Sequence, residues 1–308
     1  MRYLDPKNDL TFKRIFGEHP ALLMSLLNAL LPLEDGNEVT ELEYLPSELV
    51  PDIPEFKNSI VDVRCTDRTG RQFIVEMQML WTASFKARVL FNASKAYIRQ
   101  IAKAKKYSSL QPVYALNILD DIFVSPEKNP HYYHHYSIIH TEDPDEKLEG
   151  LEFVFIELPK FVPRNLAQKR MAILWLRFLT EVKDREDADY AELRSSCDEL
   201  SQALDILKES SFTIGELDHY DRFWDSVRKE KTYADERAEL AQKEGFSKGE
   251  EIGLAKGEEI GKELGKAELT EKMILKCHHK GMTVAEIADL TDVAAEDVLA
   301  ILRKNGLA

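Results

Sequence analysis

The stretch NSIVDVRCTDRTGRQFIVEMQML, residues 58–80, decides how the centre of this chain folds. Two segments rich in β-branched and apolar residues, 58–66 and 72–80, flank the polar segment DRTGR at 67–71, which contains Gly70. Two such segments joined by a short polar loop with glycine are typical of a β-hairpin. We therefore expect two antiparallel strands that are connected by this loop.

Three polar residues stand inside these apolar strands. Asp62 lies in the first strand, and Glu76 and Gln78 lie two residues apart in the second, so these two point to the same face. The hairpin can bring Asp62 beside Glu76, and neighbouring carboxylates repel each other unless a cation lies between them. Oxygen ligands with open positions suit Mg²⁺, and the backbone carbonyl of Met77 is a further candidate ligand. The alternative is that both acids face solvent on a half-exposed sheet.

The segments around the hairpin indicate an α/β fold. Helical patterns occur at 9–31 and 83–106, and further strand patterns occur at 38–45, 111–119 and 151–158. The resulting order of helices and strands predicts a mixed central sheet that is flanked by helices.

Charge is distributed unevenly along the 308 residues. The net charge is −14, but residues 1–110 hold 15 basic and 14 acidic residues, so the acidic excess belongs to the remainder. The segment 77–119 contains no acidic residue and seven basic ones: Lys86, Arg88, Lys95, Arg99, Lys103, Lys105 and Lys106. A local basic surface can bind phosphate groups whatever the total charge. A solvated helix face is the alternative interpretation.

Several classes of protein receive no support from the sequence. The sequence contains no run of about 18 apolar residues, so it predicts no transmembrane helix. Its N-terminal segment is charged where a signal peptide would be apolar. We therefore expect a cytoplasmic protein without a membrane partner. The cysteines form no CxxC pair and predict neither zinc nor a disulfide. The segment HYYHHYSIIH at 131–140 contains four histidines without the spacing of a metal site, and we interpret it as a loop or an edge strand.

The order and spacing of these features resemble the PD-(D/E)XK nuclease superfamily, and more closely the recombination-promoting nuclease/transposase family of bacteria. The resemblance rests on Asp9, Phe12, Lys13, Phe16, Asp62, Glu76, Met77, Gln78, Arg88, Tyr97, Gln100, Tyr107 and the segment ILD at 118–120. It covers residues 1–235 and implies a metal-dependent DNA endonuclease with a restriction-endonuclease-like core. It also implies a role in recombination, mobile elements or phage defence.

The resemblance assigns roles to individual residues. It implies that Asp62, Glu76 and Gln78 are catalytic, and that Asp62, Glu76 and the carbonyl of Met77 bind Mg²⁺ or another divalent cation. Gln78 stands where the superfamily more often has lysine, and because glutamine is no base at neutral pH, activation of water would rest mostly on the metal.

Other residues of the resemblance are expected to contact DNA. They are Lys13, Lys86, Arg88, Lys95, Arg99 and Gln100. Support of the site or helix packing is the alternative for Arg88 and Gln100, and pairing with an acid is the alternative for Lys13. Asp9 is interpreted as the N-cap of the first helix.

A regular glycine spacing marks the helical C-terminal region. The stretch GFSKGEEIGLAKGEEIGKELGK, residues 245–266, has a glycine at every fourth position. Glycine costs about 1 kcal/mol relative to alanine inside a helix, but it lets two helix backbones approach closely. We therefore interpret 245–265 as a helix that forms a homodimer, and a frayed spacer is the alternative.

The chain is expected to consist of three parts: a nuclease-like domain with a helical extension at 1–235, a charged glycine-repeat helix at 236–268, and a small helical module at 269–308. Three short helices are expected within 270–305, and the last two resemble a helix-turn-helix with a break at Thr291–Asp292. Acidic residues begin its second helix, which disfavours DNA reading and favours protein docking. A catalytically weak protein that acts through this helical tail is the alternative to a nuclease.

Overall fold

The computed structural model describes residues 2–49, 59–101, 106–163, 170–183 and 190–307. The chain divides into two compact units, Met1–Lys231 and Thr232–Ala308.

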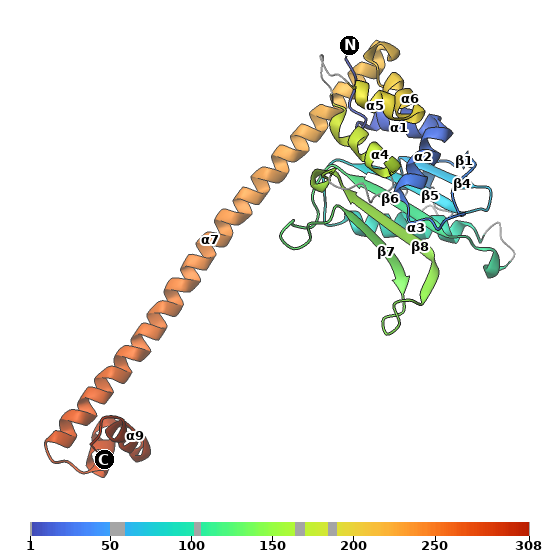
Figure 1. The fold of residues 1–308 in the computed structure, drawn as a ribbon. Helices are drawn as coiled ribbons and strands as arrows, with labels where there is room; N and C mark the ends of the chain where they lie inside the picture. Colours follow the sequence, from blue (N-terminus) through green and yellow to red (C-terminus); the bar gives the residue numbers. More distant parts are fainter. Residues whose placement is uncertain (1, 50–58, 102–105, 164–169, 184–189, 308) are drawn as a thin grey trace. The chain divides into compact units, whose positions relative to one another are not determined.

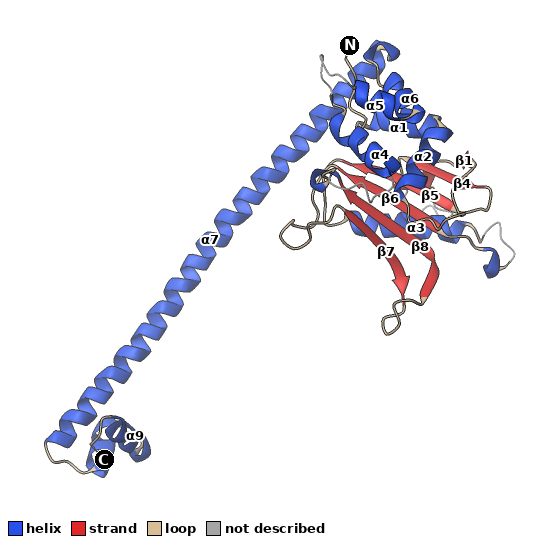
Figure 2. Ribbon diagram, viewed as in Figure 1, coloured by secondary structure: helices blue, strands red, loops and turns tan. Residues whose placement is uncertain are grey.

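A mixed six-stranded sheet forms the centre of the first unit (Figure 2). Its strands are, in chain order, β1 (Leu42–Tyr44), β4 (Val63–Asp67), β5 (Gln72–Gln78), β6 (Val113–Leu119), β7 (Tyr133–Ile139) and β8 (Lys147–Glu157). They lie in the spatial order β1-β4-β5-β6-β8-β7. The neighbours β5, β6 and β8 are parallel, and the other neighbours are antiparallel.

Helices cover both faces of this sheet, which confirms the predicted mixed sheet with flanking helices (Figure 1). One face packs against α1 (Asp9–Glu18), α2 (Pro20–Leu30), α4 (Arg170–Glu181), α5 (Ala191–Ser196) and α6 (Asp198–Ile206). The opposite face packs against α3 (Phe85–Arg99), whose Phe85, Val89 and Ala93 contact the cluster that includes Ile74 and Ala115. Short 3₁₀ turns occupy Tyr107–Ser109, Leu158–Lys160 and Glu209–Ser211.

The predicted hairpin forms between β4 and β5. Val63 lies opposite Val75, and Gly70 in the connecting turn has a φ of +91°. Glycine adopts this left-handed conformation without the steric penalty that a Cβ atom imposes. The glycine of the polar loop therefore allows the tight return of the chain.

The predicted first strand of the hairpin is wrong in one respect, because it is not continuous. The chain leaves the sheet at residues 61–62, and β3 (Ser59–Ile60) pairs instead with β2 (Glu48–Leu49) in a separate two-stranded sheet. Residue 58 lies outside the described residues. Asp62 therefore stands in a break between two strands, where its side chain does not have to follow the alternation of a strand.

The N-terminal helices begin at residues of suitable chemistry. Asn8, not the expected Asp9, caps α1, since its side chain accepts a hydrogen bond of 3.0 Å from the backbone N–H of Leu10. Asp9 lies in the first turn, where a carboxylate interacts favourably with the helix dipole. Pro20 begins α2, a position that needs no N–H group of its own.

The C-terminal region consists of α7 (Ile214–His279), α8 (Val284–Thr291) and α9 (Ala295–Lys304). The glycine-spaced segment lies within α7, and the first of the three short helices expected in 270–305 is the end of α7 rather than a separate element. A small core unites this end with the last two helices through Ile274, Cys277, Ile287, Val298 and Leu302. Asp292 has a φ of +54° and ends α8, as the predicted break requires.

Along the described residues, no helix combines the length and the apolar character that crossing a bilayer demands.

Candidate active site

Asp62 and Glu76 meet where β4 begins and β5 ends. The register that sets Val63 opposite Val75 would, one residue further, set Asp62 opposite Glu76. The Oδ2 atom of Asp62 accepts a hydrogen bond of 2.7 Å from the backbone N–H of Met77. The Asp62 carboxylate thus contacts the backbone of the residue that follows Glu76, and the charge of Glu76 acts on it.

Burial raises the pKa of both carboxyl groups. Glu76 is 6% exposed, and burial raises its pKa although a hydrogen bond from Asn92 and the charge of Arg88 oppose the rise. Burial also raises the pKa of Asp62 to about 6, with a smaller rise from the charge of Glu76 and an opposing effect of the bond from Met77. A cation at this pair would favour the ionised form of both groups.

The oxygen atoms of this pair fit a hard divalent cation. Mg²⁺ prefers oxygen ligands and keeps several water molecules, so it does not require a complete cage of side chains. Among the residues that the structure describes, no group of three or more His, Cys, Asp or Glu could hold a metal ion. The further ligands of an ion at Asp62 and Glu76 would come from the backbone, from water or from a substrate. The carbonyl of Met77 stays a prediction in this role.

Helix α3 supplies two partners to Glu76. The Nδ2 atom of Asn92 donates a hydrogen bond of 3.0 Å to Oε1 of Glu76, and Nη2 of Arg88 lies 3.7 Å from Oε2. Both oxygens of this carboxylate therefore face a donor from the same helix, which fixes its orientation on the sheet.

Gln78 is joined to the same helix. Its Oε1 atom accepts a hydrogen bond of 2.6 Å from Nη2 of Arg88, and its Nε2 atom donates one of 2.7 Å to the carbonyl of Leu80. Where the superfamily more often has a lysine, this chain thus holds a neutral amide that contacts a guanidinium. The positive charge at this position comes from α3 rather than from β5.

Asn92 was not expected from the sequence. It is 1% exposed, and its Oδ1 atom has no hydrogen-bond partner within the described part of the chain. The available signal was a lone amide on the apolar stripe of α3, between the buried residues Val89 and Ala96. A buried polar side chain usually serves a specific hydrogen bond, and here the bond is to Glu76.

Two of the expected DNA-contacting residues lie close to the carboxylate pair. Arg88 contacts Glu76 and Gln78 as described, and its side chain is half exposed. Lys13 forms an ion pair of 2.7 Å with Asp9, and the charges of both residues act on Asp62. Pairing with an acid, one of the two interpretations of Lys13, is thus observed.

Of the other expected contacts, Lys86 and Lys95 lie on α3, and Gln100 directly follows it. Lys86 sits 4.5 Å from the ring centre of Phe123, and Lys95 sits 5.2 Å from that of Phe91. Gln100 exchanges two hydrogen bonds of 2.9 Å with the backbone of Gln111 and so ties the end of α3 to the start of β6. Both hydrogen-bonding groups of the Gln100 amide are therefore already engaged in helix packing.

A pocket of about 520 Å³ adjoins the end of β5. Met77, Gln78 and Asp9 line it, together with residues at the start of α7 that include His219 and Arg222. The pocket gives this end of the sheet an open volume in which a substrate can lie.

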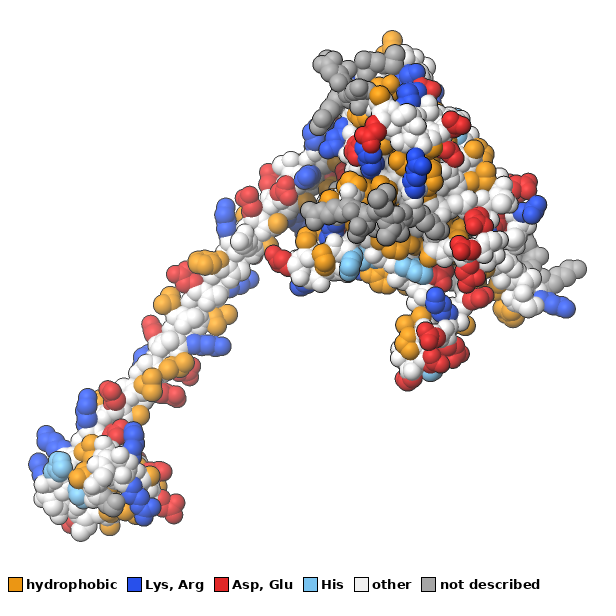
Figure 3. All heavy atoms as spheres, viewed as in Figure 1, with side chains coloured by type: hydrophobic (Ala, Val, Ile, Leu, Met, Phe, Trp, Pro, Cys, Tyr) orange, Lys and Arg blue, Asp and Glu red, His pale blue; other side chains and the backbone are white. Residues whose placement is uncertain are grey.

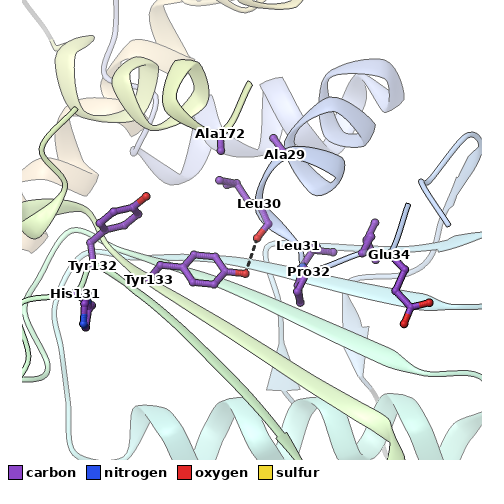
Figure 4. A pocket seen from close by; sticks show the side chains of 10 residues that line it. Ala29, Leu30, Leu31, Pro32, Glu34, His131, Tyr132, Tyr133 and Ala172 are labelled. Atoms are coloured by element: carbon purple, nitrogen blue, oxygen red, sulfur yellow. Dashed lines mark hydrogen bonds between the residues drawn. The ribbon is translucent and has the colours of Figure 1, made fainter. Parts of the chain in front are cut away.

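The histidines of 131–140 do not converge on a metal site. His131 lines a different pocket, of about 640 Å³, beside Tyr132 and Tyr133 (Figure 4). His134 and His135 contact Glu157 and Glu152 separately. Residues Tyr133–Ile139 form the edge strand β7, which confirms the edge-strand interpretation.

A family model for the PD-(D/E)XK nuclease family transposase matches residues 6–243. No curated protein and no solved structure matched the chain. The matched range includes the carboxylate pair, the sheet and α3, and it agrees with the expected resemblance. The chain therefore belongs to the family of PD-(D/E)XK nuclease transposases.

Proposed function

We propose that this protein is a metal-dependent DNA endonuclease that hydrolyses phosphodiester bonds at Asp62 and Glu76. The observation that carries the proposal is the pair of carboxyl groups, Glu76 buried and Asp62 half-buried, whose neighbours Met77 and Gln78 line an open pocket, in a chain whose family suggests a nuclease or a transposase-like role. The family also suggests that the activity serves recombination, mobile elements or phage defence.

Asp62, Glu76 and the carbonyl of Met77 would hold Mg²⁺ or another divalent cation. When bound, such an ion lowers the pKa of a water molecule and stabilises the charge that builds on a phosphodiester. Asn92 keeps Oε1 of Glu76 in one orientation through its hydrogen bond. The carboxylate is then already positioned before an ion or a substrate arrives.

Gln78 and Arg88 would act together next to the pair. Glutamine does not take up a proton at neutral pH, so Gln78 is assigned a positioning role in catalysis. Its Oε1 atom holds the Arg88 guanidinium near Glu76. A fixed positive group at this place would stabilise negative charge on the phosphate in the transition state.

DNA would bind along the basic side of α3 and at Lys13 of α1. The residues proposed to contact it are Lys13, Lys86, Arg88, Lys95, Arg99 and Gln100. Lysine and arginine contacts to phosphates supply affinity without reading sequence, so we expect binding that weakens steeply with salt.

Plasmid cleavage tests the proposed activity. The full-length protein is incubated with supercoiled DNA in Mg²⁺, Mn²⁺, Ca²⁺ or EDTA, beside the variants Asp62→Ala and Glu76→Ala. We expect nicking in Mg²⁺ or Mn²⁺ and a loss of roughly a thousandfold or more in each variant, because each substitution removes a metal ligand. Asp145→Ala, in an exposed loop, is the matched control and should cut normally. Equal cutting by all the variants would place the activity outside this site.

We further propose the three-part division into 1–235, 236–268 and 269–308, with a homodimer formed through 245–265. The support is that apolar side chains in this segment, including Phe246, Ile252 and Ile260, are exposed within the chain. Sedimentation of the full-length protein and of a 1–240 truncation tests it. We expect a dimer and a monomer respectively, and two monomers would refute the dimer.

The same exposed side chains favour a second candidate function, a catalytically weak protein that binds a partner through its helical tail. Plasmid cleavage separates the two functions. If no DNA is cut under any metal condition and the tail still associates, the interaction protein is the better description.

A further inference from the structure

Arg64 is a buried arginine in the middle of the β4–β5 hairpin. It lies two residues after Asp62, opposite Ile74 in the register of the two strands. Its neighbours Val63 and Cys65 pack into the core below the sheet, so the Arg64 side chain lies on the other face, which α3 covers. It therefore shares a face with Glu76, whose carboxylate bonds to α3.

The guanidinium of Arg64 is only partly satisfied. The residue is 8% exposed, and its Nη2 atom donates one hydrogen bond of 2.9 Å to Oε1 of Gln72. Its Nε atom is buried and has no hydrogen-bond partner in the described part of the chain. Buried side-chain donors usually have partners, so the Arg64 guanidinium has hydrogen-bonding capacity that the described residues do not use.

The surroundings of Arg64 are positive. Within the described residues, neither Arg64 nor Arg99 pairs with a carboxylate. Burial and the charge of Arg99 lower the pKa of Arg64, and burial and the same Arg99 lower that of Lys95. Arginine nevertheless stays protonated at the pH of any cell, so the hairpin carries a buried charge with which no carboxylate of the described residues pairs.

This arrangement fits a phosphate oxygen better than a structural role. A structural buried arginine needs a carboxylate close by, because an unpaired buried charge is unfavourable. A guanidinium donates to phosphate from several N–H groups in one plane, and one of the Arg64 donors already has Gln72 to hold it in place. The guanidinium is thus oriented by Gln72, and no carboxylate of the described residues pairs with it.

We propose that Arg64 and Arg99 form a second phosphate-binding subsite, which holds a backbone phosphate beside the one that is cut at Asp62 and Glu76. The proposal rests on the proposed nuclease function. Arg88 lies at the start of α3 near Glu76, and Arg99, whose charge acts on Arg64, is the last residue of α3. A DNA strand that runs along α3 would therefore meet the cut site first and this subsite next.

Binding of DNA in EDTA tests the subsite, since it needs neither a metal nor cleavage. The affinity of the full-length protein for a short fluorescein-labelled duplex is measured by anisotropy over a range of salt concentrations. We expect Arg64→Gln to weaken binding about tenfold and to reduce the slope of log affinity against log salt by about 1. Arg64→Lys keeps the charge but not the planar set of guanidinium donors, so its affinity for DNA should lie between those of the wild type and Arg64→Gln.

A matched control removes an arginine that has carboxylate partners. Arg177 on α4 pairs with Glu181 and Glu192, so Arg177→Gln should leave both the affinity and the salt slope unchanged. Thermal unfolding of each variant gives the second readout. We expect Arg64→Gln to unfold at the wild-type temperature or above, because it removes an unpaired buried charge.

Each other outcome overturns the subsite in a recognisable way. If Arg64→Gln binds DNA as the wild type does while plasmid cleavage persists, the subsite is wrong and the nuclease stands. If the variant unfolds at a much lower temperature and Arg64→Lys binds normally, Arg64 is structural. If inorganic phosphate raises the unfolding temperature of the wild type but not that of Arg64→Gln, and both bind DNA with the same affinity, the ligand is free phosphate. If the wild type binds no DNA, the proposed function fails and the subsite fails with it.

Discussion

The sheet domain and the glycine-spaced segment of α7 differ in the burial of their side chains. In the domain, acids such as Glu76 and Glu157 are buried and bonded to residues far away in the sequence. In 245–266, the glycines have open space where a Cβ atom would stand, and Phe246 is 76% exposed. Apolar and charged side chains of both signs lie side by side along this segment (Figure 3).

This difference indicates how strongly a single substitution should act in each region. A buried acid in the domain has its chemistry set by its neighbours, so single substitutions there should have large effects. In the glycine-spaced segment, the described residues leave open space beside every glycine, so we expect a specific role there to depend on a partner.

The largest expected effect is on the stability of the domain. Glu157 accepts hydrogen bonds from His134, from Lys160 and from the backbone N–H groups of residues 123 and 124. Glu157→Ala would leave the buried charge of Lys160 without its ion-pair partner, so we expect a loss of about 3–5 kcal/mol in the free energy of unfolding. Urea denaturation of the full-length protein measures it.

A matched acid on α7 gives the control. Glu259 is exposed, and Glu259→Ala should change the unfolding free energy by less than about 0.5 kcal/mol. Equal effects of the two substitutions would contradict the contrast between the regions.

A smaller effect is expected at the carboxylate pair. Asn92→Ala removes the bond to Glu76, and partners of a metal ligand typically contribute ten- to a hundredfold to metal affinity or activity. We expect cleavage to fall by about that factor and to require more Mg²⁺ for half-maximal rate. Titration of Mg²⁺ in the plasmid assay measures both. Ser94→Ala on the same helix is the control, and a similar loss in it would point to a general disturbance of α3.

The pH dependence of stability should also distinguish the buried acid. Hydrogen bonds from Lys160 and His134 hold the pKa of Glu157 below its ordinary value of 4.5, in spite of burial. A lowered pKa in the folded state means that the carboxylate stabilises the fold above pH 4.5, and that this contribution disappears as the pH falls through the folded pKa. The wild type should therefore have a higher free energy of unfolding than Glu157→Gln near neutral pH, and this difference should disappear in acid. Urea denaturation at several pH values measures it. An advantage that is constant down to low pH would contradict this assignment.

The smallest effect is expected on α7. Because nothing lies within 4 Å of a Cβ atom added at Gly253, Gly253→Ala should increase helix content and stabilise the helix by up to about 1 kcal/mol. If two copies pack through their glycines, the same methyl group should weaken the homodimer. Circular dichroism and sedimentation measure the two effects. An unchanged dimer with more helix would move the contact away from the glycine line, and Ser247→Ala controls for substitution as such.

Part of this molecule follows from local sequence alone. The hairpin was predictable because two apolar segments and a loop glycine are neighbours in the chain, and Gly70 does adopt a positive φ. The helices α1, α2 and α3 follow from apolar periodicity, and Pro20 marks the start of α2. Asp62, Glu76 and Gln78 stood out because polar residues are unusual inside strongly apolar strands.

The remaining features depend on contacts between segments that are distant in the chain. The break at 61–62 allows the Asp62 carboxylate to reach the N–H of Met77. The alternation of apolar residues did not predict this break, because it continues through these positions. The packing of α3 on the sheet made Asn92 a partner of Glu76, and within the described residues it left Arg64 without a carboxylate. Residue type and spacing determined the elements and the reactive groups of this protein. Tertiary structure decided which groups face one another, because burial and register set the partners and the charge that each group experiences.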